Sequence, residues 1–330
     1  MIDLHHHFDG ALSVEALYKE AQRRNLPQGK LLPLEFASRC RVGDDCKTLT
    51  DFLAVFNFFY DIAQNIDFLH EQAKTLPNTL KQQGLVYAET RFAPNLFADK
   101  KNSVVEVTEA VLSGLNHDPT QIPVRLILCV MRNSSLSDLN DLLMLYEKFE
   151  SRGVCGIDLA GDESQFPCLE YIPIFDRARE MEIPVTIHAG EAAGPDSVKI
   201  ALDQFHARRI GHGIQSIQDA ELVRRLADQG IPLEVCLTSN VQTGNAKNLI
   251  SHPFMDLYRQ GVKVTINTDD PTVSGIDLQH EWRSAIQTFQ LSQADQNQIL
   301  QNSIDAAFCE ASLKRELQKQ LFEIPLTERL

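Results

Sequence analysis

Five short, mostly apolar segments of this chain run into residues that can bind a metal ion or move a proton. Such runs are typical of strands buried on both faces, and the polar residues come at their carboxyl ends. In a barrel of parallel strands these ends meet at one rim, where the reactive groups gather. The pattern indicates metal-dependent hydrolysis. The segments are Ile2–Gly10, Val185–Glu191, Arg209–Gly213, Val235–Asn240 and Val264–Pro271.

His5 and His7 are two residues apart on the first predicted strand. Side chains at this spacing point to the same side, so both imidazoles can reach one ion, whereas His6 points the other way. A lone pair of this kind is more often a polar strand end than a metal site. Asp9 follows at once and three other strand ends offer ligands, which favours the metal site.

His188 and Glu191 belong to one His-Ala-Gly-Glu segment. Neutral imidazole is a suitable third ligand, and Gly190 lets the chain turn so that the carboxylate folds back towards the ion. A dry pocket raises the pKa of a carboxyl group, which makes Glu191 a candidate acid near neutral pH. His212 stands between two glycines and can approach a ligand or a water molecule closely. A packed core histidine is an equal alternative there.

Asp269 and Asp270 end the last apolar segment. Adjacent side chains diverge, so one can bind a metal ion while the other faces a substrate. Two-metal barrel hydrolases commonly bridge their ions with a modified lysine on the fourth strand, but the fourth predicted strand, Val154–Leu159, contains no lysine. A single ion held by three histidines and one aspartate, with a position open for water, suits zinc.

The elements that must position these residues alternate between strand and helix. Helical patterns over Asp138–Arg152 and Asp219–Gly230 each end at a glycine stop signal, Gly153 and Gly230. This alternation predicts an α/β fold, and eight strands favour a TIM (β/α)8 barrel over the alternative, an open doubly wound sheet. The predicted strands are Ile2–His5, Val86–Phe92, Val124–Met131, Val154–Leu159, Val185–His188, Arg209–His212, Leu233–Cys236 and Val262–Asn267.

Two stretches exceed a minimal barrel. Residues from about 12 to 84 are too long for one crossover and contain helical patterns at Ser13–Arg24 and Thr50–Ala63, so we expect a helical insertion at the barrel mouth after the first strand. Residues Ser292–Glu328 predict C-terminal helices. Because no flexible linker is visible, residues 1–330 are expected to form a single domain.

Composition narrows the class of partner and the compartment. The formal net charge of −14 disfavours nucleic acid and suits a neutral or cationic small molecule. Neither a secretory signal nor a membrane-spanning run is visible, so no membrane partner is expected. The seven cysteines are scattered without a C-x-x-C pair, which predicts reduced thiols in a cytoplasmic protein and makes a cysteine zinc site improbable.

Taken together and in order, the motifs resemble those of the adenosine deaminase family, in particular its bacterial branch. The resemblance spans nearly the whole chain and implies a zinc-dependent enzyme that hydrolytically deaminates adenosine and 2′-deoxyadenosine to inosine and 2′-deoxyinosine, releasing ammonia in purine salvage. The matching segments are residues 4–10, 88–94, 157–163, 188–191, 211–213, 238–244 and 267–271.

The resemblance also implies a role for each matching residue. One zinc ion per chain would be held by His5, His7, His188 and Asp269. Glu191 would donate a proton to N1 of the purine, and His212 with Asp269 would position and deprotonate the attacking water. The substrate contacts would comprise His7 beside the nucleoside, Asp270 at N7, the Gly161 N–H at N3, Asp9 at the ribose 5′-hydroxyl, and an apolar cover of Leu49, Phe52, Leu53 and Phe56.

The substrate is the point on which alternatives stay open. Asp9 stands where free-adenine deaminases of this superfamily typically have Glu, and its shorter side chain leaves room for a sugar. The alternatives are adenine or a 5′-modified adenosine, and AMP would need a basic cluster that is not seen near the motifs. A non-catalytic metal-binding protein would be expected to lack some of these residues. The sequence leaves the oligomeric state open.

Overall fold

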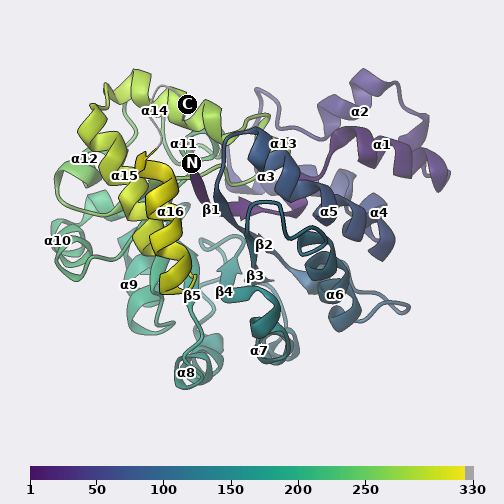
Figure 1. Cartoon of the computed structure of the whole chain (residues 1–330), viewed down its shortest axis with the longest axis horizontal. Coiled ribbons are helices and arrows are strands. Elements are labelled where there is room, and N and C mark those ends of the chain that lie inside the picture. Colours follow the sequence, from purple (N-terminus) through teal and green to yellow (C-terminus); the bar gives the residue numbers. More distant parts are fainter. Residues whose placement is uncertain (324–330) are drawn as a thin grey trace.

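Eight parallel strands form the centre of the computed structural model, which describes residues 1–323 (Figure 1). Each strand pairs with the next in chain order, from β1 to β8. The backbone of Asp269 joins the two ends of the sheet, because its N–H donates to His5 O and its carbonyl accepts from the His7 N–H, both at 2.8 Å. The predicted (β/α)8 barrel is therefore confirmed, and the open-sheet alternative is wrong. The strands are β1 (Ile2–His7), β2 (Tyr87–Phe92), β3 (Val124–Met131), β4 (Val154–Ala160), β5 (Val185–Ala189), β6 (Arg209–His212), β7 (Leu233–Val235) and β8 (Val264–Ile266).

Helices surround the barrel, and none within residues 1–323 is long and apolar enough to cross a membrane. They are α1 (Val14–Arg23), α2 (Pro33–Arg39), α3 (Leu49–Ala54), α4 (Tyr60–Ala63), α5 (Ile66–Gln82), α6 (Val104–Leu115), α7 (Leu136–Phe149), α8 (Ile172–Glu180), α9 (Pro195–Asp203), α10 (Ala220–Gln229), α11 (Leu237–Gln242), α12 (Phe254–Arg259), α13 (Pro271–Ser274), α14 (Leu278–Phe289), α15 (Gln293–Ala306) and α16 (Ala311–Glu323).

Capping residues explain where the predicted helices begin and end. The pattern over Asp138–Arg152 starts two residues earlier, because Ser135 and Asp138 form a capping box at the start of α7. The α-helix stops at Phe149, and a 3-10 turn leads to Gly153, whose φ of +113° suits glycine. Helix α10 follows its prediction closely, with Asp219 as its N-cap.

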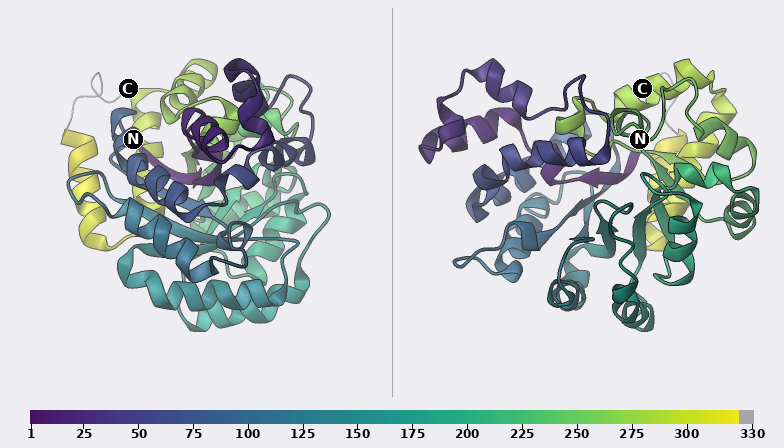
Figure 2. Two further views of the ribbon diagram at one scale, coloured as in Figure 1. Left: turned by 90° about the vertical axis from the view of Figure 1, so that its right-hand side faces the viewer. Right: turned by 180° about the vertical axis from the view of Figure 1, so that it is seen from behind.

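The long stretch after β1 is helical, as predicted. Ser13 caps α1, accepting a hydrogen bond from the Ala16 N–H. Helices α1 to α4 project beyond the strands on one side of the molecule, whereas α5 packs along α6 in the ring around the barrel (Figure 2). Phe52, Phe56 and Phe59 are buried, and they anchor this insertion to the barrel.

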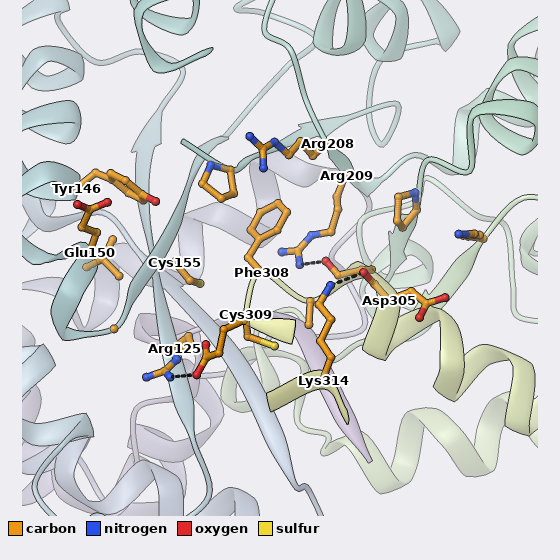
Figure 3. A pocket seen from close by; sticks show the side chains of 18 of the residues that line it. Arg125, Tyr146, Glu150, Cys155, Arg208, Arg209, Asp305, Phe308, Cys309 and Lys314 are labelled. Atoms are coloured by element: carbon orange, nitrogen blue, oxygen red, sulfur yellow. Dashed lines mark hydrogen bonds and ion pairs between the residues drawn. The ribbon is translucent and has the colours of Figure 1, made fainter. Parts of the chain in front are cut away.

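The C-terminal region forms two helices, α15 and α16, rather than one continuous run, and the predicted part beyond Glu323 lies outside the described residues. The segment between them closes the amino-terminal end of the barrel. Phe308 donates its N–H to Glu89 Oε1, and its ring lies 3.7 Å from the Arg209 guanidinium (Figure 3). A cavity of about 890 Å³ opens here, away from the strand ends that carry the candidate reactive groups.

The barrel interior is charged, although the strand sequences look largely apolar. Arg91 contacts Asp158 Oδ2 at 3.0 Å and Glu234 Oε2 at 2.8 Å. Arg209 contacts Glu234 Oε1 at 2.5 Å and Glu89 Oε2 at 2.7 Å. Three of these four pairs join strands that are not neighbours, so they cross the interior of the barrel, whereas Arg209–Glu234 joins the neighbouring strands β6 and β7. The apolar side chains of the same strands pack outwards against the helices.

Glu281 on α14 holds the start of α11, the short helix that follows β7. Its carboxylate accepts a hydrogen bond from the Thr238 N–H at 3.2 Å and contacts the Thr238 hydroxyl. The first N–H groups of a helix lack partners within it, so Glu281 acts as a remote cap. Burial raises the pKa of Glu281 to about 7, although the bonds to Thr238 oppose this shift.

This raised pKa predicts a pH-dependent stability. Below about pH 4.5 Glu281 is protonated in both the folded and the unfolded protein. Between about pH 4.5 and 7 the carboxyl group ionises readily only in the unfolded chain, so the free energy of unfolding decreases as the pH rises. We expect the free energy of unfolding of Glu281→Gln, relative to that of wild type, to increase by about 1–3 kcal/mol between pH 4.5 and 8. Urea unfolding at several pH values checks this, with exposed Glu180→Gln as the control. A pH-independent difference would contradict it.

Candidate active site

Three imidazoles and one carboxylate meet at the carboxyl rim of the barrel. His5 and His7 lie at the end of β1, His188 lies in β5, and Asp269 follows β8. Asp269 Oδ1 is 3.3 Å from both His5 Nε2 and His7 Nε2, and His7 Nε2 is 3.2 Å from His188 Nε2. The four ligand atoms lie within 4.8 Å of one another. The structure thus brings together the four residues that the sequence predicts as metal ligands.

The surroundings of two imidazoles leave one ring nitrogen of each directed at this cluster. His5 Nδ1 lies 2.8 Å from Glu234 Oε2, and His188 Nδ1 lies 3.0 Å from Asp158 Oδ2, so these carboxylates accept the Nδ1–H groups. His5 Nε2 is buried and lacks a hydrogen-bond partner. A buried polar atom needs a partner, and a divalent ion would be one. Nitrogen donors with one carboxylate fit zinc.

The charge states also suit a metal ion. Burial lowers the pKa of His7 and His188, which favours the neutral imidazole that binds metals. Burial opposes ionisation of Asp269, but the neighbouring imidazoles, above all His212, hold its pKa well below the usual range. Burial also acts against protonation of His5, but the adjacent carboxylates of Asp269 and Glu234 outweigh it and raise the pKa of that ring.

His212 lies at the end of β6, beside the ligand cluster. Its Nε2 is 3.5 Å from Glu191 Oε2 and 4.0 Å from Asp269 Oδ2. Its φ of +59° is unusual for a residue other than glycine, and Asp269 shares this conformation with a φ of +63°. Gly211 permits the crowding, since a Cβ there would lie 3.0 Å from the His5 ring.

A chain of hydrogen bonds assigns the ring proton of His212. The Phe254 N–H can only donate, and it bonds His252 Nδ1 at 3.1 Å. Burial lowers the pKa of His252 to about 4, so its proton sits on Nε2, which donates to Asn240 Oδ1 at 3.3 Å. The Asn240 amide N–H then donates to His212 Nδ1 at 3.0 Å. Neutral His212 therefore carries its proton on Nε2, facing Glu191 and Asp269.

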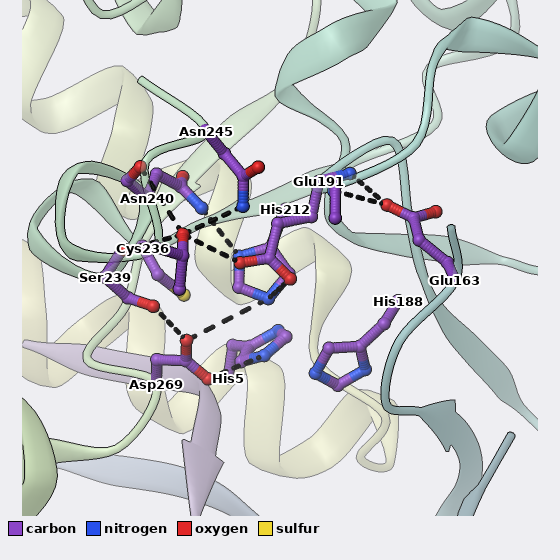
Figure 4. A network of polar contacts seen from close by, with 12 residues as sticks. His5, Glu163, His188, Glu191, His212, Cys236, Ser239, Asn240, Asn245 and Asp269 are labelled. Carbon is purple, nitrogen blue, oxygen red and sulfur yellow. Dashed lines mark hydrogen bonds and ion pairs between the residues drawn. The ribbon is translucent and has the colours of Figure 1, made fainter. Parts of the chain in front are cut away.

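Glu191 is buried in the loop after β5. Burial, and then the charges of Asp269 and Glu163, raise the pKa of Glu191 well above its usual value, so it can serve as an acid. Figure 4 shows this carboxyl group beside His212. Thr243 donates its hydroxyl to Glu191 Oε1 at 3.4 Å.

Glu163 holds the loop that carries Glu191. Its carboxylate accepts the backbone N–H groups of Gly190, Glu191, Ala192 and Ala193 at 2.6–2.9 Å, and it also contacts the Ser197 hydroxyl. Figure 4 shows Glu163 beside Glu191. Four N–H groups on one carboxylate fix the path of this turn. Glu163 lies in one of the matching segments, but the motifs implied no role for it.

Asp269 and Asp270 diverge, as their adjacency predicts. Ser239 donates to Asp269 Oδ2 at 2.6 Å, while Asp269 Oδ1 faces the imidazoles. Asp270 Oδ1 is buried without a hydrogen-bond partner, and burial followed by the charge of Asp269 raises its pKa. Gly10 is required beside it, because a Cβ there would overlap Asp270 Oδ1 at 1.8 Å.

A cavity next to the ligand cluster brings the predicted substrate residues together. Asp9 is buried at its edge with Oδ1 unpartnered, and burial raises the pKa of this carboxyl group to about 6. The apolar part comes from the insertion and the polar part from the strand ends. The predicted residues that line it are His7, Asp9, Leu49, Phe52, Leu53, Phe56, Gly161, His188, Glu191, His212, Asp269 and Asp270.

Several residues of the site were not identified from the sequence. Tyr60, Met131 and Ala160 also line the cavity. Asp158 and Glu234 are acids in apolar strands, which is a signal that could have marked them as partners of buried cations or histidines. Cys236 Sγ lies within 4.8 Å of the nearest ligand atoms of His212 and Asp269, but burial raises the pKa of the thiol and makes it a poor ligand.

Comparisons with known proteins place this geometry in a family. A family model described as adenosine deaminase matches residues 1–324. An adenosine deaminase from Haemophilus ducreyi is 38% identical over 96% of this chain and 94% of its own. Another, from Clostridium acetobutylicum, is 32% identical over 97% of this chain and 96% of its own.

Solved structures share the fold. An adenine deaminase from Arthrobacter aurescens superposes with a TM-score of 0.87 at 23% identity, over 98% of both chains. An N6-mAMP deaminase from Arabidopsis superposes with a TM-score of 0.85 at 24% identity, over 98% of this chain and 97% of its own. An amidohydrolase from Burkholderia ambifaria with bound Zn superposes with a TM-score of 0.84 at 22% identity, over 98% of this chain and 90% of its own. With the family model and the relatives matching nearly end to end, the chain belongs to the adenosine deaminase family.

Proposed function

We propose that this chain hydrolyses adenosine and 2′-deoxyadenosine at C6, giving inosine and 2′-deoxyinosine and releasing ammonia. The observation that carries the proposal is the meeting, in one cavity, of a three-histidine, one-aspartate cluster with two carboxyl groups whose pKa values are raised. Relatives at 32–38% identity bear the name adenosine deaminase. We further propose that the chain acts as one domain, in cytoplasmic purine salvage.

One zinc ion per chain would be held by His5, His7, His188 and Asp269. When bound, it would supply Lewis acidity that makes water a nucleophile near neutral pH. The orphaned His5 Nε2 and the ordered Nδ1 contacts of His5 and His188 support this assignment. No lysine is present on β4, within Val154–Ala160, to bridge a second ion.

Glu191 and Asp270 would recognise the purine as protonated acids. N1 and N7 of adenine are both acceptors, so each needs a donor, and the raised pKa of each carboxyl group supplies one. Proton donation by Glu191 to N1 draws electrons from C6 and makes it electrophilic. The Gly161 N–H would donate to N3. These contacts would hold C6 towards the cluster of imidazoles.

The water oxygen would add to C6, and the C6–N6 bond would then break. Asp269, whose pKa is held low, would accept the proton of the attacking water. His212 would position that oxygen through its Nε2–H, because Asn240 occupies its Nδ1. The proton taken up by Asp269 would pass to the amino nitrogen, which leaves as ammonia. The hydroxyl on C6 would give its proton to Glu191, which restores that acid, and the purine keeps the new oxygen as a carbonyl.

The ribose would lie between Asp9 and the apolar cover. Asp9 Oδ1, buried and unpartnered, would accept a hydrogen bond from the 5′-hydroxyl, and His7 would contact the nucleoside. Leu49, Phe52, Leu53 and Phe56 would exclude water from above.

A spectrophotometric assay tests the function directly. The absorbance of adenosine should change to that of inosine, and a chelator should abolish the change until zinc is restored. Adenine, 5′-methylthioadenosine and 2′-deoxyadenosine are run in parallel. Turnover of adenine alone would reject the nucleoside as substrate, and full activity after verified metal removal would reject the metal.

Glu191→Gln should lower kcat by about 10²-fold or more, because the amide cannot deliver the proton to N1. Zinc content, measured by atomic absorption, should not change, since Glu191 is not among the proposed ligands. Exposed Glu180→Gln serves as the matched control. Activity within a few-fold of wild type would show that another group donates the proton.

Asn240→Asp should move the ring proton of His212, since a carboxylate at this position accepts an Nδ1–H rather than donating to Nδ1. We expect kcat to fall about 10-fold or more with zinc retained. Nitrogen NMR of the imidazole reports the tautomer directly, and exposed Asn140→Asp is the control. An unchanged tautomer would refute the hydrogen-bond chain.

A further inference from the structure

Tyr60 is the first residue of α4, where the helical insertion meets the cavity. No sequence motif marks this tyrosine, which directly follows Phe58 and Phe59. Its hydroxyl nevertheless donates to Asp9 Oδ2 at 3.2 Å, joining the insertion to the turn after β1. The contact crosses 51 residues of sequence, so it depends on how the insertion docks on the barrel.

Aromatic neighbours fix the ring that carries this hydroxyl. The Tyr60 ring lies 5.5 Å from Phe56 and 5.6 Å from Phe97, and the second pair is nearly perpendicular at 82°. Edge-to-face contacts of this kind hold a ring in one orientation. Burial raises the pKa of Tyr60 well above its usual value, so the hydroxyl keeps its proton and acts as a donor.

The contact leaves the two oxygens of Asp9 unequal. Oδ2 accepts from Tyr60, while Oδ1 is buried and has no hydrogen-bond partner among the described residues. With one oxygen occupied, the carboxylate cannot turn without losing that bond, so Oδ1 is the oxygen left to accept a hydrogen bond from a ligand in the cavity. The group that Oδ1 can bind is a hydrogen-bond donor such as a hydroxyl.

The charges around the cavity disfavour a phosphate in the same place. Within residues 1–323, no lysine or arginine lines this cavity. Asp9, Glu191, Asp269 and Asp270 do line it, and a phosphate would meet carboxyl groups rather than cations. A ligand here therefore presents an uncharged or cationic donor to Asp9 rather than a phosphate.

We infer that Tyr60 is a specificity-determining residue, which acts through Asp9 to select purine nucleosides that have a free 5′-hydroxyl. This inference rests on the proposed function and narrows its substrate class. Tyr60 orients the acceptor and leaves the chemistry at C6 unchanged. Its removal should therefore penalise only substrates that carry the hydroxyl.

The test compares two substrates that differ in one atom, adenosine and 5′-deoxyadenosine, in three zinc-loaded proteins. These are wild type, Tyr60→Phe and the matched control Tyr18→Phe. Tyr18 lies in the same insertion and donates its hydroxyl to Leu31 O at 2.8 Å, outside the cavity. Both substitutions remove one phenolic hydroxyl and one hydrogen bond.

We expect Tyr60→Phe to lower kcat/KM for adenosine about 5- to 20-fold, as for a hydrogen bond to a charged group, and to leave 5′-deoxyadenosine within about 2-fold. The loss should lie in KM more than in kcat. Tyr18→Phe should leave the ratio of the two substrates unchanged.

Equal losses for the two substrates would overturn the inference, because Tyr60 would then only shape the cavity. An unchanged kcat/KM for adenosine would overturn it as well. If wild type turns over neither nucleoside, the proposed function itself fails, and the inference falls with it. Adenosine turnover with equal losses isolates failure of the Tyr60 role alone.

Discussion

The ion pairs inside the barrel are the constraint on which the site depends. Arg91 and Arg209 hold Glu89, Asp158 and Glu234 in a space that water does not reach, and two of these carboxylates orient His5 and His188. Removing one partner of such a pair typically costs about 3–5 kcal/mol, because a buried charge is left alone. With Asp269 added, four carboxylates face two guanidinium groups. Among these groups, negative charge is in excess next to the proposed metal site, which would favour a cation there.

Three carboxyl groups line the cavity at the carboxyl rim of the barrel, and their pKa values are shifted in opposite directions. Neighbouring imidazoles hold the pKa of Asp269 well below its usual range, whereas burial and the charge of Asp269 raise the pKa of Asp270 and of Glu191. Residues outside the reacting groups maintain this difference. Glu163 fixes the Glu191 loop through four N–H groups, and Asn240 directs the proton of His212. The acid and base roles proposed for these groups would thus follow from position rather than residue type.

The sequence was sufficient for the barrel, because its eight apolar runs and glycine stops are local signals. It also located the candidate ligands, since each ends a strand. Other features depend on distant pairing. Asp158, Glu234 and Arg91 are buried where the strands suggested an apolar interior, and only the closed barrel shows that they neutralise one another. Tyr60 reaches Asp9 because of the docking of the insertion, which no local pattern encodes.

Because Asp269 both closes the barrel and completes the cluster, the site can form only after this late residue has been synthesised. His5 and His7 are synthesised well before Asp269, which lies more than 260 positions later and supplies both the backbone that locks their strand and the carboxylate that completes their cluster. During synthesis His5 and His7 therefore lack their contacts with Asp269 until the segment after β8 has been made. A chain truncated before Asp269 would therefore lack one of the four residues of the cluster.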